Sequence, residues 1–151
     1  MMLSKNLSLA EVIKSQTAIR KNIDNRPSLR HQDNLIAIAQ AVFQPLRDWY
    51  GKPITVSSGY RSPQLNQAIN GSLSSQHCKG EALDLDVGDE NFMLFDYIRL
   101  NLDFDQMIWE FGDDVNPAWV HVSYSNDTPN RKQILKAVKI DGKSKYQQWQ
   151  G

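Results

Sequence analysis

The stretch EALDLDV, residues 81–87, alternates apolar and acidic side chains and constrains the fold more than any other part of the chain. Successive side chains of a β-strand point to opposite faces, so the aliphatic residues share one face while Asp84 and Asp86 share the other. An unpaired charge inside a protein is costly, so carboxylates on a core strand usually have a partner or a metal ion. The stretch therefore predicts a sheet with one apolar face and one face that carries charged groups.

The rest of the chain predicts helices and further strands around this one. Helices are expected at residues 9–20, 32–51, 62–71 and 91–102, and strands at residues 53–60, 105–111, 119–125 and, last, 131–140. Ser8 and Glu11 form a capping-box pattern before the first helix, and Pro45 predicts a kink in the second, which Gly51 ends. We expect an α+β fold, a small and mostly antiparallel sheet flanked by helices, in a single domain of residues 1–151.

Charge and cysteine content exclude several classes of protein. The chain has 17 basic and 17 acidic residues, which argues against a general binder of nucleic acid or of a membrane surface. Cys78 is the single cysteine, so no internal disulfide can form. The N-terminal residues contain no long apolar run, so we expect synthesis in a cytoplasm without a signal peptide. A monomer is also expected.

Three residues from two distant segments could share a metal ion. His77 and Asp84 are seven positions apart, about 23 Å in an extended chain, so the segment must fold back, and Gly80 allows a sharp bend. His121 alternates with two valines and faces away from them. Two histidines and one carboxylate would leave an open position on a catalytic zinc ion. From spacing alone, a structural strand histidine and a solvent-facing aspartate remain equally good interpretations.

A general base is suggested by the expected hairpin between the strands at 105–111 and 119–125. Symmetric pairing about residues 113–118 sets Glu110 opposite His121, with Cβ atoms about 5 Å apart on one sheet face. Glu110 could then take a proton from metal-bound water, whose pKa falls toward about 7 on zinc. A single bulge would turn Glu110 to the other face, and a surface glutamate paired with a lysine is the alternative.

Two motifs resemble a known family. His77, Gly80, Ala82 and Asp84 match the pattern H-x-x-G-x-A-x-D, and Trp119 with His121 matches W-x-H. With SSGYRSPQLN at 57–66, these motifs are similar to those of the zinc D-alanyl-D-alanine carboxypeptidases and L-alanyl-D-glutamate endopeptidases. These are bacterial and bacteriophage peptidoglycan peptidases with a hedgehog-like fold. The resemblance covers most of the chain up to about residue 125, in the small single-domain branch of the family.

The resemblance implies roles for individual residues. His77, Asp84 and His121 would be the ligands of Zn²⁺, and Arg61 would lie near the substrate, where its fork could bind a carboxylate or polarise a carbonyl. Ser75 and Gln76 would either donate hydrogen bonds to the substrate or only shape the loop.

One position departs from the family pattern. Several members carry a catalytic glutamate three residues before the last histidine, where this chain has Ala118. The resemblance suggests that Glu110 takes this role, and Asp86 is the second candidate, although it could instead support a histidine. Cys78 is expected to be a passive loop residue, and His31 is given no role.

The expected function is that of a zinc metallopeptidase that hydrolyses the peptide stems of peptidoglycan, acting at the bacterial cell wall. The alternatives are a non-catalytic cell-wall-binding or phage structural module that keeps the fold, and a metal-independent peptide-binding domain. All three candidate ligands and a glutamate are present, which favours the enzyme.

Overall fold

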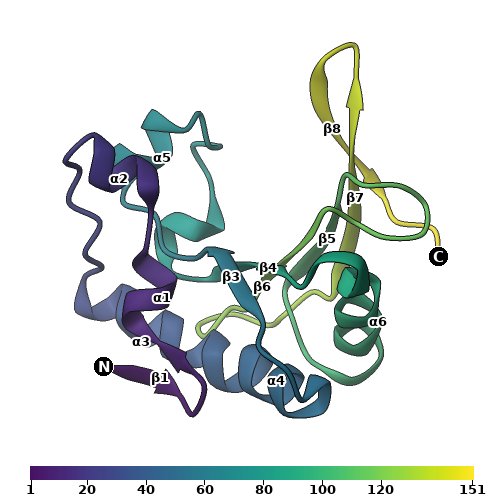
Figure 1. The fold of residues 1–151 in the computed structure, drawn as a ribbon, viewed down its shortest axis with the longest axis horizontal. Helices are drawn as coiled ribbons and strands as arrows, with labels where there is room; N and C mark the ends of the chain where they lie inside the picture. Colours follow the sequence, from purple (N-terminus) through teal and green to yellow (C-terminus); the bar gives the residue numbers. More distant parts are fainter.

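A computed structural model describes residues 1–151 and has a six-stranded mixed sheet at its centre (Figure 1). The strands lie in the order β3-β4-β6-β5-β7-β8, and every neighbouring pair is antiparallel except β5 and β7, which are parallel. Their bounds are β3 Thr55–Ser58, β4 Ala82–Asp86, β5 Gln106–Glu110, β6 Trp119–Ser123, β7 Gln133–Ile140 and β8 Lys143–Gln148. A separate small hairpin joins β1 Met2–Ser4 to β2 Leu7–Ser8.

Helices flank this sheet and confirm the predicted α+β class. They are α1 Leu9–Ile13, α2 Gln16–Arg20, α3 Leu29–Ile38, α4 Gln44–Tyr50, α5 Pro63–Ala68 and α6 Asn91–Asn101. Short 3₁₀ turns lie at η2 Gln76–Lys79 and η3 Gly88–Glu90. None of the helices is both long and apolar enough to cross a bilayer.

Strict alternation along β4, β5 and β6 divides the sheet into two chemically different faces. One face carries Leu83, Leu85, Met107, Trp109, Val120 and Val122, which belong to one buried cluster with side chains of α3, α4 and α6. The opposite face carries Asp84, His121 and Glu110. The apolar face therefore holds the helices against the sheet, and the polar face is left for a site, as the EALDLDV pattern predicts.

The predicted kink at Pro45 takes the form of a π-helical turn, η1 Ala39–Phe43, between α3 and α4. Proline has no N–H, and its ring collides with the carbonyl four residues earlier in a regular helix. Here the N–H of Gln44 instead bonds to the carbonyl of Ala39, five residues back. The helix ends at Gly51, whose φ of +73° is the left-handed value expected for such a cap.

The helix predicted at residues 9–20 is wrong, because the chain forms two short helices there. The capping box between Ser8 and Glu11 is confirmed, but α1 ends at Ile13. Ser15 has an extended conformation, and its hydroxyl accepts a hydrogen bond from the N–H of Ala18. A serine that caps a new helix competes with continuation of the old one, and here the new cap prevails.

The hairpin register predicted around Glu110 is also wrong, by two residues. Glu110 pairs with Trp119, and Ile108 is the residue opposite His121. Phe111 and Gly112 have φ values of +55° and +70°, so the strand ends at Glu110 and the loop is asymmetric. Because side chains alternate with a period of two, this shift keeps Glu110 on the same face as His121.

The strand at 131–140 is not the last one. After β7 the chain turns at Asp141 and Gly142, both with positive φ, and returns as β8. All six residues of β8 are exposed, and the β7–β8 hairpin projects from the sheet as an arm (Figure 1).

The bend predicted at Gly80 is confirmed, with a φ of +71° at the start of the turn into β4. A Cβ at this position would lie 2.5 Å from the backbone carbonyl oxygen of His31. Gly51 has nearly the same φ but no atom within 4 Å of an added Cβ. Replacing each glycine by alanine therefore separates two contributions to the free energy of unfolding. Both variants carry the cost of a positive φ, and only the variant at Gly80 also carries the cost of the steric collision.

We expect Gly80→Ala to lower the free energy of unfolding by roughly 1–3 kcal/mol more than Gly51→Ala does. Both variants carry the left-handed penalty of about 1–2 kcal/mol, and only Gly80→Ala also forces the backbone of α3 away from the loop. Urea unfolding of the two variants measures the difference. Equal losses would show that the loop moves freely relative to α3.

Candidate metal centre

His77, Asp84 and His121 meet on the polar face of the sheet. One ligand-type atom from each lies within 4.8 Å of the others. Asp84 on β4 and His121 on β6 are directly opposed in the antiparallel pair, and His77 reaches them from η2. All three are buried, with relative exposures of 7% for Asp84, 8% for His121 and 3% for His77. Such burial requires that the groups satisfy one another or a shared ion.

The hydrogen bonds of His77 turn one ring nitrogen toward the centre of the cluster. Its Nδ1 lies 2.7 Å from the carbonyl oxygen of Gly59, which can only accept, so Nδ1 carries the proton. Its Nε2 then has a free lone pair and lies 3.3 Å from Oδ1 of Asp84. A backbone carbonyl that orients a histidine in this way is the usual partner of a metal-binding imidazole.

His121 presents the other nitrogen to the same point. Its Nδ1 lies 3.0 Å from Oδ1 of Asp84, and its Nε2 lies 3.2 Å from Oε1 of Gln76. The rings of His77 and His121 stand edge to face with centroids 5.1 Å apart. Two imidazole nitrogens and one carboxylate oxygen are a donor set that suits zinc and leaves an open position for water or substrate.

The charges around Asp84 keep it ionised despite burial. Burial alone would raise its pKa, but the neighbouring imidazoles of His77 and His121 hold that pKa well below its usual range. Arg61 adds a further cation, with Nη2 at 3.6 Å from Oδ2 of Asp84. An ionised carboxylate is the form that a metal ion requires.

Glu110 faces the same centre from β5 in a different electrostatic state. Burial raises its pKa to about 7, with a further rise from Asp84, while His121 and Arg61 lower it. A carboxyl group with a pKa near neutrality can both accept and release a proton at the pH of a cell, which is the property of a general base.

Arg61 and Ser75 lie beside the cluster, and their predicted roles toward a substrate stay predictions. The guanidinium of Arg61 is held by Ser58 and Asn66, with Nε at 3.1 Å from Ser58 Oγ and Nη1 at 3.4 Å from Asn66 Oδ1. The hydroxyl of Ser75 accepts a hydrogen bond from the N–H of His77, so it shapes the loop that carries the ligand. Both residues line a cleft over the cluster.

A cleft of about 620 Å³ lies over the cluster and contains all seven predicted site residues. Leu135, Ser144 and Tyr146 of the β7–β8 arm line one side of it, and Gly71, Ser72 and Ser74 line the other. The β7–β8 arm and α5 stand on opposite sides of the fold (Figure 1). Sequence reasoning missed the arm residues because β8 shows no burial pattern.

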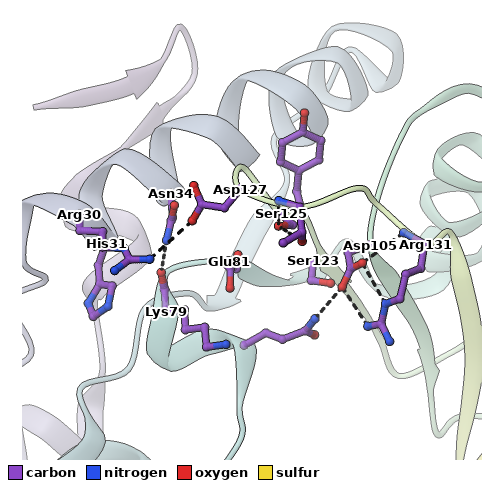
Figure 2. Close-up of a pocket in the computed structure, with 13 residues that line it drawn as sticks. Arg30, His31, Asn34, Lys79, Glu81, Asp105, Ser123, Ser125, Asp127 and Arg131 are labelled. Carbon is purple, nitrogen blue, oxygen red and sulfur yellow. Dashed lines mark hydrogen bonds and ion pairs between the residues drawn. The ribbon is translucent and has the colours of Figure 1, made fainter.

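The other residues considered from the sequence lie outside this cleft. Asp86 accepts hydrogen bonds from the N–H of Gly88 and from the amide of Asn91, so it holds the turn after β4. Cys78 is half-buried, and burial raises the pKa of its thiol. His31 lines a second, polar cavity of about 610 Å³, which includes Asp105 and Arg131 (Figure 2).

Comparison with known proteins agrees with this geometry. The family described as Peptidase M15 matches residues 5–123, so the chain belongs to the M15 peptidase family. A zinc D-Ala-D-Ala carboxypeptidase of Streptomyces albus G is 35% identical over 57 residues, which make up 38% of this chain. The chain matches only 22% of the length of that relative.

The raised pKa of Glu110 makes the stability of the metal-free protein depend on pH. The native state holds the proton up to about pH 7, whereas an ordinary glutamate releases it near 4.5, so stability falls as the pH rises between these values. We expect wild type to lose about 2–3 kcal/mol relative to Glu110→Gln over this range. Urea unfolding at several pH values measures this, and parallel curves for the two proteins would contradict it.

Proposed function

We propose that the protein is a zinc-dependent peptidase that hydrolyses bonds in the peptide stems of bacterial peptidoglycan. One observation carries this proposal: the ligand atoms of His77, Asp84 and His121 converge in a cleft that also contains Glu110 and Arg61. Membership of the M15 peptidase family and the name of the Streptomyces relative support zinc and the peptidoglycan substrate.

Each side chain then has a chemical task. Zinc held by His77, Asp84 and His121 would supply Lewis-acid activation of water and of the scissile carbonyl. Glu110 takes the proton from the attacking water and passes it to the leaving amine, which is the task of a general base. Arg61 faces the same cleft with a positive charge that stabilises the developing negative charge on the carbonyl oxygen.

The fork of Arg61 bears on which bond is cut. A guanidinium that binds a free C-terminal carboxylate suits the terminal D-Ala–D-Ala bond, whereas one that polarises a carbonyl suits the internal L-Ala–D-Glu bond. Mass spectrometry of defined muropeptides after digestion distinguishes these cuts, since each leaves a different mass.

A non-catalytic wall-binding or phage structural module is the competing proposal. Such a protein has no need of a buried glutamate with a pKa near neutrality beside the cluster, because an uncompensated carboxyl group in a buried site is destabilising. Action at the cell wall, a monomeric state and the single domain of residues 1–151 remain predictions of the sequence.

We expect His121→Ala to lose zinc, because two remaining ligands hold the ion far less tightly than three. Metal analysis of the purified proteins after dialysis against trace zinc measures this. His31→Ala is the matched control, since this histidine lines the neighbouring polar cavity and not the cleft over the cluster. Stoichiometric zinc in a folded His121→Ala protein would remove this residue from the ligand set.

We expect Glu110→Gln to retain zinc but to cleave muropeptides about 10²–10⁴ times more slowly, because the amide cannot accept the proton. Asp86→Asn tests the second candidate base and should cleave at a rate close to wild type, since Asp86 lies outside the cleft. The reverse pattern, full activity in Glu110→Gln and loss in Asp86→Asn, would assign the base to Asp86.

A further inference from the structure

We propose that Gln76 and Asp105 are positioning residues that fix the proton of His121 on Nε2 and thereby set the affinity of the site for zinc. This inference rests on the proposed zinc centre, gives Gln76 a role different from the one that the resemblance implies, and extends the centre to Asp105, which the sequence analysis does not single out.

A continuous chain of hydrogen bonds leads away from the cluster. Nε2 of His121 lies 3.2 Å from Oε1 of Gln76, and Nε2 of Gln76 lies 3.3 Å from Oδ2 of Asp105. Arg131 holds Asp105 from the other side, with Nε at 3.0 Å from Oδ1 and Nη2 at 2.9 Å from Oδ2. Figure 2 shows this ion pair at one end of the polar cavity.

The chemistry of Asp105 gives this chain a direction. An ionised carboxylate only accepts hydrogen bonds, so the side of the Gln76 amide that faces Asp105 must be the NH₂ group. The carbonyl oxygen of Gln76 therefore faces His121 and requires a proton on Nε2. Nδ1, the nitrogen that is 3.0 Å from Asp84 and faces the metal cluster, is then the atom that can exchange its proton for a zinc ion.

Asp105 is held firmly enough to fix the orientation of the Gln76 amide. Its N–H donates to the carbonyl of Ser123 on β6, and its own carbonyl accepts from the N–H of Gln133 on β7, so the backbone is fixed between two strands. Hydrogen bonds from the side chain of Arg131 also hold the pKa of Asp105 below its usual range. Asp105 therefore stays an acceptor throughout the neutral range.

Replacing Asp105 by asparagine keeps a side chain of the same size but no longer fixes which end of the Gln76 amide faces it. An asparagine amide can donate as well as accept, so the Gln76 amide can rotate and present its NH₂ group to Nε2 of His121. That arrangement favours the proton on Nδ1, where it blocks the metal-binding lone pair.

The experiment measures zinc binding by competition with a chromophoric chelator. We expect Asp105→Asn to bind zinc about 10–100 times more weakly than wild type, the range typical for loss of a residue that orients a metal ligand. Asp24→Asn is a closely matched control, because Asp24 accepts from the N–H, Nε and Nη2 of Arg26 just as Asp105 does from Arg131. Its zinc affinity should equal that of wild type.

A second readout needs no metal at all. In ¹⁵N-correlated spectra of the metal-free protein, Nε2 of His121 should be protonated in wild type, whatever proton Nδ1 donates to Asp84, and Asp105→Asn should show a smaller protonated fraction at Nε2. A purely structural role for Asp105 would change the melting temperature without changing this fraction. Wild-type zinc affinity and an unchanged protonated fraction at Nε2 in Asp105→Asn would overturn the proposal.

Gln76→Leu provides an independent variant, because it removes the acceptor for His121 while leaving Asp105 paired with Arg131. We expect the same 10–100-fold loss of zinc affinity, and no further loss when Asp105→Asn is added, since both act through one bond. Wild-type affinity in folded Gln76→Leu would overturn the proposal by itself. A wild-type protein that binds no zinc would instead refute the proposed function, and the measurement of protonation at Nε2 would still decide this inference.

Discussion

The antiparallel pairing of Asp84 with His121 across β4 and β6 is the constraint on which the rest of the structure depends. The same register places Leu83 opposite Val122 in the apolar core. A slip of one residue would bury the carboxylate under the helices and expose the aliphatic side chains, so the core and the metal centre are specified together. The hydrophobic effect, which needs no metal, therefore brings two of the three candidate ligands into position.

The third candidate ligand is held by a different device. Nδ1 of His77 bonds to the carbonyl of Gly59, and the carbonyl of His77 in turn accepts from the N–H of Arg61. These two hydrogen bonds join the loop before β4 to the turn after β3. They therefore position the imidazole of His77 and the backbone of Arg61 relative to each other. The position of Gly80 against α3 closes the loop from its other end.

The parts of the fold with regular patterns could be predicted from the sequence. Alternation in β4 and β6 located the polar face, and helical spacing located α3, α4 and α6. The register around Glu110 was missed because Phe111 adopts a positive φ, which no pattern predicts for an aromatic residue. β8 was missed because it is exposed throughout and so has no alternation. The contact between Gln76 and Asp105 joins side chains 29 positions apart and depends on the tertiary fold alone.

The β7–β8 arm has a consequence for how such a protein can change over time. The family match ends at residue 123, and the ligand candidates, Glu110 and Arg61 all precede that point. Leu135, Ser144 and Tyr146, which wall the cleft, all follow it. Mutation in the arm can therefore reshape what fits into the cleft without disturbing the residues that would perform the reaction, so selectivity and chemistry are free to evolve separately.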